Sequence, residues 1–567
     1  MKSYISKFFT GVALLSMTGL ASCVGDLDQM PNDPNTITSG NFGSDPTAAM
    51  AAVMGKCYSS LALSGQGGPD GGSDISGLDG GTSNWSRVIF MLNEFTTDEV
   101  SWIWPDVGVF DLCTSTWGTS NGNLFGAYGR LYTHISVCND FLRGYRDGLY
   151  GSSAEGDQFA REARALRDLS YYYIIDFFGN ATLAWDNMPY GEVPEQKTRA
   201  ELFKIVTDDL EDVLTGFQDS GIYGRVGKDG VEALLCKFYL NAEVFTGTAM
   251  YDKCWSHAQN IISRHQGGGF QGSGLANDYL ALFCRSNDMF APGGSLKAQN
   301  EILWTIPFEY PYTESYGGTM FLVASSISAS SMPTVLYGLN ADWSCMHARE
   351  QFADKFNFTA DGYSEDGRTY LWCTEKQGFK KANDEFSKFT SGYAAVKFTN
   401  CRADGNGVMP RQTYTNEEGV VFNWAGVPEV NGLPAQTENF TSSDFPIIRL
   451  ADVYLMAAEC SLRGAGDKAT GLNYVNLVRN RAGVTAWADA TFNLDNLLDE
   501  RSRELYWENV RRTDLVRFGK FAGNTYNWAW KNNVREGAGI PEYMNLFPIP
   551  ADIVATYGSS MKQNPGY

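Results

Sequence analysis

The sequence predicts a mostly α-helical protein built from degenerate, tetratricopeptide-like helical hairpins, with long irregular loop insertions and a few short strands. Two observations support this fold class. Apolar residues recur every three or four positions, which is the spacing of one helix face, as along Leu124, Tyr128, Leu131, Ile135, Cys138 and Leu142. Short connections also join consecutive helical segments, which favours stacked helical pairs. No clean 34-residue period is present, so any repeat is degenerate.

Helix signals follow one another along the chain. The acidic residues Glu155 and Asp157 open one helix and Gly179 closes it, which matches helix polarity and C-capping. Thr198 with Glu201 three residues later forms a capping box for the next helix. The expected helices are 44–62, 123–148, 155–178, 198–217, 231–245, 251–265, 447–462, 469–481 and 494–518.

The segments between the helices divide the chain into a helical core and insertions. We expect one domain over 44–567, with its helical core at about 44–265 and 447–518 and a packing tail at 519–567. Loop-rich insertions span about 65–122 and 266–446, where Gly, Ser, Asn, Asp and aromatic residues are frequent. Loops of that length are usually functional or disordered, and their aromatic content argues against disorder.

The N-terminus predicts export and lipid anchoring. Residues 1–22 have a positive start at Lys2 and Lys7 and an apolar stretch too short to cross a membrane. Leu20-Ala21-Ser22-Cys23 looks like a bacterial lipobox, which implies cleavage before Cys23 and acylation of that cysteine. Residues 23–43 then read as a flexible tether. The alternative is an ordinary secretory signal followed by a chance cysteine.

Composition narrows the ligand classes. The net charge of −21 repels phosphate backbones, so we exclude nucleic acid as the main ligand. Aromatic residues make up 14% of the chain, an excess that suits a recognition surface as well as a core. The ten cysteines beyond Cys23 form no C-x-x-C pair, so we expect no metal site, and disulfide pairing stays open.

Several motifs together resemble the SusD/RagB family of outer-membrane glycan-binding lipoproteins. They are Arg161–Arg167 running into Tyr171–Tyr173 and Phe177–Gly179, Asn300–Trp304, Phe445–Glu459 with Val475–Gly483, Glu500–Leu505 through Arg517, and Phe547–Pro550 with Gln563–Tyr567. The resemblance implies a lipid-anchored protein on the extracellular side of the outer membrane. It also implies a glycan site, a SusC-like TonB-dependent transporter as partner, and neither catalysis nor a cofactor.

The charged motif residues are expected to be structural. Glu508 lies three and four residues before Arg511 and Arg512, so it can pair with them along a helix surface. The same interpretation applies to Arg449 and Asp452, which stand between apolar turns.

Candidate ligand-binding residues fall in two loop regions, where the family builds its glycan site. Trp102 and Trp104 stand at i and i+2 in an extended stretch and point the same way, either as a stacking platform or as two plugs in a core pocket. Tyr310, Tyr312, Tyr316 and Trp343 form the second cluster. Asp74, Asp79 and Arg87 are candidate hydrogen-bonding partners, with solvated loop charges as the alternative.

The sequence leaves two other functions open. A peptide-binding subunit of a similar transporter is the main alternative, because an acidic surface suits basic peptides. A glycoside hydrolase needs two suitably spaced carboxylates, and 65 acidic residues leave such a pair open. The sequence has no H-E-x-x-H motif and only four His, which argues against catalysis.

Overall fold

The computed structural model describes residues 45–75, 77–285, 287–288, 298–404, 408–426 and 438–567. Cys23, the leader 1–22 and the tether 23–43 lie outside the described residues. Within the described part of the chain, no helix combines the length and the apolar character needed to cross a bilayer.

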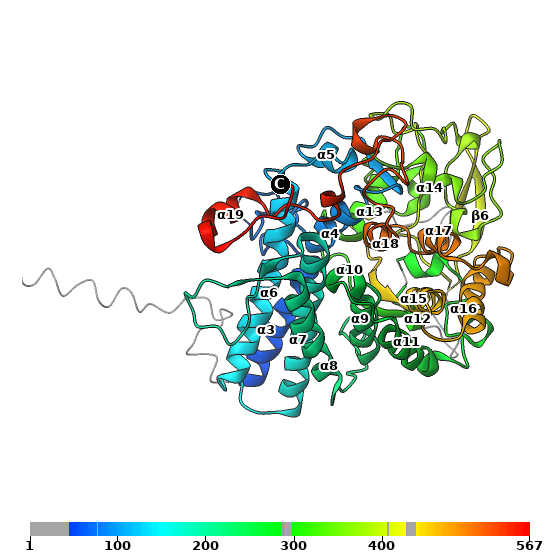
Figure 1. Cartoon of the computed structure of the whole chain (residues 1–567). Helices are drawn as coiled ribbons and strands as arrows, with labels where there is room; N and C mark the ends of the chain where they lie inside the picture. Colours follow the sequence, from blue (N-terminus) through cyan, green and yellow to red (C-terminus); the bar gives the residue numbers. More distant parts are fainter. Residues whose placement is uncertain (1–44, 76, 286, 289–297, 405–407, 427–437) are drawn as a thin grey trace, which may run out of the picture.

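The first half of the chain is a row of packed helices. Each helix contacts the next one along the row, from α6 on α7 through α8, α9 and α11 to α15 and α16 of the second half. Figure 1 shows α3, α6 and α7 side by side, with α8, α9 and α11 following beside them. The helices are α3 (Pro46–Ala62), α6 (Gly122–Arg146), α7 (Ala154–Phe178), α8 (Arg199–Leu214), α9 (Lys228–Leu240), α10 (Ala242–Thr246) and α11 (Tyr251–His265). These bounds confirm the predicted helical fold class.

Local capping explains where these helices begin and end. The Ser153 hydroxyl accepts a hydrogen bond from Gly156 N at 3.0 Å at the start of α7, and Gly179 ends that helix with a φ of 68°. The predicted capping box is present, since Thr198 and Glu201 bond reciprocally at the start of α8.

The second half contains α15 (Leu450–Leu462), α16 (Lys468–Arg481), α17 (Leu494–Leu505), α18 (Arg511–Arg517) and α19 (Ala551–Tyr557). The prediction of one helix over 494–518 is wrong. The chain breaks between α17 and α18, where Trp507 and Asn509 have φ of 62° and 63°. That break turns the Trp507 indole into the core, where it is fully buried. The burial of this large ring outweighs the helical preference of the flanking residues.

Among the described residues, four two-stranded antiparallel sheets complete the framework. β4 (Ile302–Ile306) pairs with β8 (Phe445–Arg449), so the helix predicted from 447 begins only at Leu450. The other pairs are β1 (Val100–Trp102) with β5 (Met346–Ala348), β2 (Ala181–Thr182) with β3 (Gln196–Lys197), and β6 (Arg411–Thr415) with β7 (Val421–Ala425).

The described parts of the two insertions contain helices that the sequence did not indicate. They contain α4 (Trp85–Asn93), α5 (Val109–Cys113), α12 (Ala298–Glu301), α13 (Gly318–Ser326) and α14 (Glu350–Asp354). Short 3₁₀ helices of the second insertion lie at Phe270–Gly272, Leu280–Phe283, Thr334–Tyr337, Gly367–Thr369 and Glu375–Gln377. Other short 3₁₀ helices follow later in the chain, at Asp489–Thr491, Lys531–Asn533, Glu542–Asn545 and Gly558–Ser560.

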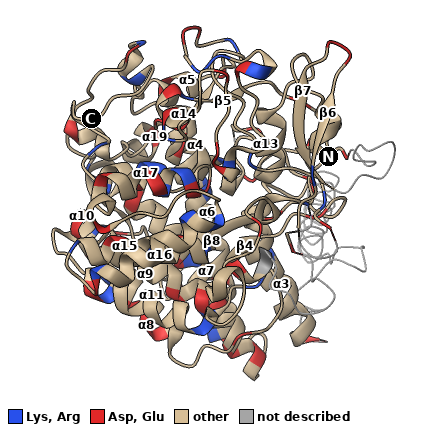
Figure 2. Ribbon diagram, turned by 90° about the vertical axis from the view of Figure 1, so that its right-hand side faces the viewer, with Lys and Arg blue, Asp and Glu red and all other residues tan. Residues whose placement is uncertain are grey.

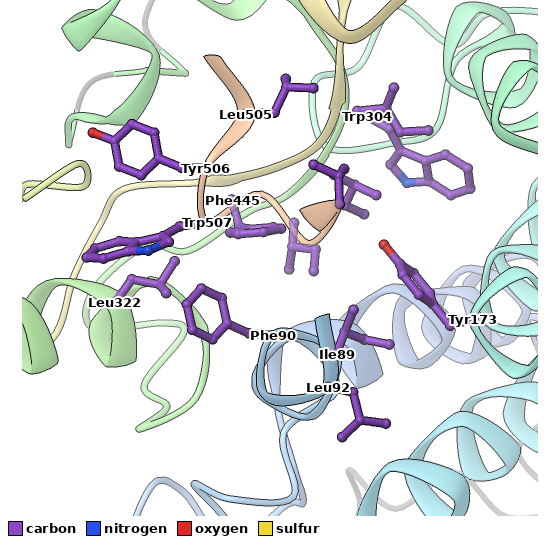
Figure 3. Packing of buried hydrophobic residues seen from close by; sticks show 14 of the residues in the cluster. Ile89, Phe90, Leu92, Tyr173, Trp304, Leu322, Phe445, Leu505, Tyr506 and Trp507 are labelled. Carbon is purple, nitrogen blue, oxygen red and sulfur yellow. The ribbon is translucent and has the colours of Figure 1, made fainter. Parts of the chain in front are cut away.

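Helix α4 lies at the centre of the hydrophobic core although it belongs to a predicted loop region. Phe90 contacts Phe321 of α13 and Trp507 edge-on, with ring centroids 5.4 and 6.4 Å apart. Figure 3 shows residues of α4 among side chains from α7, β4, α13 and the chain after α17. The core therefore joins both halves of the chain. All ten described cysteines are buried as thiols.

A buried network of charges lies beneath α17. Arg449 bonds Glu301 at 2.8 Å, Glu504 at 2.7 Å and Glu508 at 2.7 Å, and Arg481 bonds Glu301 and Glu504. Burial by itself would raise the pKa of Glu504, but the surrounding guanidinium groups lower it from its usual value. In Figure 2, acidic and basic positions lie next to each other along α17.

The expected pairing of Glu508 with Arg511 and Arg512 is wrong. Glu508 bonds Arg449 and Lys397 in the interior. Arg511 instead bonds Asp98 at 2.7 Å, and Arg512 bonds Asp176 at 3.2 Å. The helix break at residues 507–509 changes the geometry on which the helical spacing argument depended.

The tail after α18 folds back on the helical core. Phe547 and Ile549 are buried. Phe547 N donates to Phe177 O at 2.8 Å, at the end of α7, and the Asn564 amide donates to Phe178 O at 2.8 Å. The tail thus packs against α7.

Candidate functional site

The two loop regions singled out in the sequence meet at one place on the molecule. β1 pairs with β5, and Ile103 N donates to Cys345 O at 2.9 Å, so the stretch that carries Trp102 and Trp104 runs beside residues 343–345. Trp343 N donates to Ala324 O at 2.7 Å, which fixes the indole near the end of α13. Tyr316 comes just before α13 begins.

Asn84 holds the start of α4 against the start of α13. Its side-chain oxygen accepts from Ser86 N at 3.0 Å as the N-cap of α4 and lies 3.4 Å from Gly318 N. Its amide donates to Ser315 Oγ at 3.2 Å. A Cβ added at Gly317 would lie 2.2 Å from Asn84 Cβ, so only glycine allows this approach. These contacts position Tyr316.

Seven aromatic rings form a continuous row across this junction, which we call the aromatic row. Neighbouring centroids are 5.1 to 6.3 Å apart. In order, the row is Tyr310, Phe440, Tyr316, Trp343, Phe321, Trp102 and Trp104. Phe440, Phe321 and Trp102 are buried, whereas Tyr310, Tyr316 and Trp343 are half-buried and Trp104 is exposed. A buried base therefore supports an accessible rim.

Trp102 lies in the core and does not belong to the accessible rim, whereas the sequence left open a stacking platform or a core plug. Only 1% of Trp102 is exposed, against 40% of Trp104. The Trp102 indole stacks on Phe321 at 5.5 Å, and its Nε1 donates to Asp106 at 2.9 Å. Of the two tryptophans, one fills the core and the other faces solvent.

The remaining predicted aromatic residue is Tyr312. It is 85% exposed, and its backbone N donates to Glu309 O at 2.7 Å. Its ring lies outside the aromatic row, so the structure does not bring it into contact with the other predicted rings.

Arg87 and Asp79 lie beside the row, at Gly81. A Cβ added at Gly81 would lie 3.0 Å from Tyr316 Cβ, 3.3 Å from Asp79 Oδ1 and 3.4 Å from Arg87 Nη1. The Arg87 guanidinium also lies 4.6 Å from the Phe321 centroid. The structure thus gathers these two predicted polar residues around Tyr316.

Burial and neighbouring charges shift the pKa values of Arg87 and Asp79. Desolvation lowers the pKa of Arg87, and the charges of Asp79 and Asp106 offset part of that effect. Partial burial alone would raise the pKa of Asp79, but hydrogen bonds from Thr82 and the charge of Arg87 lower it. Arg87 Nε is buried and has no hydrogen-bond partner among the described residues.

Asp74 pairs with two basic residues of the helical core. Its carboxylate lies 3.4 Å from the buried Arg130 of α6 and 3.8 Å from Lys56 of α3. Arg130 also donates to Ser64 O at 3.0 Å. Asp74 therefore fastens the glycine-rich loop to α6.

Three polar residues at the site were not selected from the sequence. Asp106 accepts from Trp102, Asp342 accepts from Ser344 Oγ at 3.1 Å, and Asp70 lies close enough to raise the pKa of Tyr316 beyond the effect of partial burial. Asp106 could have been found from its place just after the Trp-Ile-Trp-Pro stretch. Among the described residues, His, Cys, Asp and Glu side chains form no group of three or more that could hold a metal ion.

The protein is thus a tetratricopeptide-like helical scaffold that carries an aromatic row as its candidate recognition site. The sequence profile of the SusD family matches residues 341–567. The starch-binding protein SusD of Bacteroides thetaiotaomicron is 30% identical over 100% of this chain and 99% of that protein. A SusD-like protein of Bacteroides ovatus is 23% identical over 72% of this chain and 69% of that protein. The chain therefore belongs to the SusD family.

Solved structures agree on the fold. A SusD superfamily protein from Parabacteroides distasonis superposes with a TM-score of 0.64, at 17% identity over 94% of this chain and 100% of that one. Surface glycan-binding protein A from Bacteroides thetaiotaomicron, in complex with laminarihexaose, superposes with a TM-score of 0.61, at 20% identity over 91% and 99%.

Proposed function

We propose that this protein is a cell-surface lipoprotein that binds a neutral glycan along the aromatic row and delivers it to a SusC-like TonB-dependent outer-membrane transporter. The observation that carries the proposal is the row itself. Sugars have apolar C–H faces that pack on aromatic rings and hydroxyl groups that need polar partners. Trp104, Trp343, Tyr316 and Tyr310 provide the accessible rings, and Arg87 lies beside them.

An α-glucan is the first ligand to consider. A relative 30% identical over the whole chain is named a starch-binding protein. A β-glucan comes second, because laminarihexaose is the ligand named for surface glycan-binding protein A. The net charge of −21 disfavours strongly anionic polysaccharides.

The sequence and the family support the proposed anchor and the proposed partner. Acylation of Cys23 would hold the protein on the outer membrane, with residues 23–43 as the tether. In that position the bound glycan can pass to a transporter in the same membrane. We propose no catalytic residue and no cofactor, because the relative named above is a binding protein.

The test is glycan retention by the soluble protein that lacks residues 1–23. We expect wild type to be retarded in native gels that contain amylopectin, with a dissociation constant for oligosaccharides of roughly millimolar to tens of micromolar, about −4 to −6 kcal/mol. Trp104→Ala combined with Trp343→Ala should strongly reduce the retardation. Tyr190→Ala is the matched control, because Tyr190 is 78% exposed and lies outside the row.

Other outcomes would redirect the proposal. A folded wild-type protein that passes unretarded through amylopectin, laminarin and other neutral glycans would contradict glycan capture. Basic peptides would then be the ligands to test. Reducing sugar released on long incubation would contradict a purely binding role.

A further inference from the structure

A large hollow lies on a different part of the molecule, between residues 358–377 and the hairpin β6–β7. Its volume is about 830 Å³, within the range of about 300–1,000 Å³ that is typical of ligand sites. A second hollow of about 520 Å³ lies on the other side of the loop 363–366, which lines both. No residue of the aromatic row lines either hollow. Figure 1 shows β6 at the right-hand edge, away from α4.

Aromatic side chains form the floor and the rim of the larger hollow. Phe358 packs against Trp372 with centroids 5.5 Å apart. Trp372 is held in place because its Nε1 donates to Tyr506 Oη at 3.2 Å. Tyr363 stands on the rim and is 52% exposed. This exposed ring beside a concave, partly apolar surface has the character of a sugar-stacking platform.

The walls of the hollow are fixed before any ligand arrives. The Asn423 amide of β7 donates to Tyr370 O at 3.0 Å, and the Tyr370 hydroxyl donates to Gln412 O of β6 at 3.1 Å. Gln377 Nε2 donates to Val421 O at 2.6 Å. These bonds hold the hairpin against residues 370–377. A preorganised wall reduces the entropy lost on binding.

The cations that line both hollows are already paired with carboxylates. Lys376 pairs with Asp361 at 3.5 Å, and Lys355 pairs with Asp98 at 2.8 Å. The two arginines of the smaller hollow, Arg479 and Arg503, both pair with Glu500. Every lining cation among the described residues therefore has a carboxylate partner. Such a surface favours a neutral polyhydroxyl ligand over a phosphate or carboxylate.

We infer that the hollows on either side of Tyr363 form a second glycan-binding site, which holds another segment of the same neutral polysaccharide that binds along the aromatic row. This inference rests on the proposed function. Two weak sites on one protein raise the apparent affinity for a long polymer, because the second binding event becomes intramolecular. A short oligosaccharide gains nothing from the second site in this way.

Tyr363→Ala is the variant that tests the second site. We expect its apparent affinity for amylopectin to fall about tenfold, with the affinity of the aromatic row for maltoheptaose, measured by calorimetry, unchanged. The variant Trp104→Ala/Trp343→Ala should keep a weak retardation on amylopectin, which addition of Tyr363→Ala removes. Tyr190→Ala is again the matched control, and circular dichroism verifies the fold of each variant.

The outcomes separate this inference from the proposed function. If Tyr363→Ala matches wild type on amylopectin and the row variant keeps no retardation, the second site is overturned and the row stands. If wild type itself is not retarded by amylopectin or laminarin, the proposed function fails and the second site fails with it.

Discussion

The Trp104 ring stands against the Trp102 ring, with centroids 5.7 Å apart and planes inclined at 70°. Trp102 in turn lies flat on Phe321, at 24°. An exposed ring is therefore supported by a buried ring that is itself fixed in the core. This arrangement holds the accessible indole rigidly, which favours binding because little motion is lost.

Substitution of the two tryptophans should separate stability from binding. Trp102→Ala removes a fully packed indole and should lower the free energy of unfolding by about 3–5 kcal/mol. Trp104→Ala should change stability by less than about 1 kcal/mol and still weaken glycan binding. Urea unfolding and gel retardation measure the two effects. Equal destabilisation by both variants would contradict the assignment of Trp104 to the accessible rim.

The buried network should depend strongly on Glu504. Its carboxylate bonds Arg449 at 2.7 Å and Arg368 at 3.1 Å, and it also bonds Arg481. Glu504→Gln leaves these buried guanidinium groups without full compensation and should lower the free energy of unfolding by about 3–5 kcal/mol. Urea unfolding measures this change.

A surface pair provides the control for the network. Lys204 and Asp208 are exposed and form an i,i+4 pair on α8. Asp208→Asn should lower stability by no more than about 0.5 kcal/mol. A comparable loss of unfolding free energy in Glu504→Gln and Asp208→Asn would show that burial does not increase the contribution of the network to stability.

The free energy of unfolding should depend on pH through the buried carboxyl group of Glu99, whose neighbour Glu94 is also buried. Burial raises the pKa of Glu99 to about 7, with a further contribution from Asp98, while Arg511 opposes the shift. The folded protein therefore holds a proton that the unfolded chain releases above its usual pKa of 4.5. The stability that this proton contributes is complete below pH 4.5 and is lost as the pH rises to about 7, a change of about 3 kcal/mol.

The variant Glu99→Gln isolates this effect. The buried His134 and His347 have pKa values lowered to about 4, so they act in the opposite direction and stabilise the protein as the pH rises from 4 to 6.5. Their contribution is the same in wild type and in Glu99→Gln. The difference in unfolding free energy between the two proteins should therefore fall from pH 4.5 to 7. A difference independent of pH would contradict the raised pKa of Glu99.

Lipid anchoring should depend on Cys23 alone. Cys23→Ala should abolish incorporation of labelled fatty acid and release the protein from the membrane fraction. The measurement is metabolic labelling followed by cell fractionation. A variant that stays in the membrane fraction and remains labelled would favour an ordinary secretory signal and another attachment.

The helical part of the fold was predictable because its signals are local. The capping box at Thr198 and the stop at Gly179 appear in the structure where the sequence places them. The break at Trp507 was not predictable, because it depends on a tertiary contact with Phe90 of α4. The helix α4 itself was missed because it is apolar on almost every side and lies between glycine-rich and irregular stretches.

The site was predictable by region and only partly by residue. Spacing placed Trp102 and Trp104 together, and the structure shows them in contact. Which of the two faces solvent depends on the pairing of β1 with β5 and on Phe321, and these contacts lie more than two hundred residues away in sequence. The pairing of Asp74 with Arg130 was not predictable for the same reason, because Arg130 lies on a separate helix.

The buried arginines of the C-terminal half also limit how the protein can be divided. The family profile covers only residues 341–567, yet Arg449, Arg511 and Arg512 reach back to Glu301, Asp98 and Asp176. A fragment cut at the profile boundary would leave three guanidinium groups without those carboxylates, at about 3–5 kcal/mol for each broken pair, against a total stability of about 5–15 kcal/mol. We therefore expect that the matching segment is not an autonomous module, and that it cannot be exchanged between relatives without the helices that precede it.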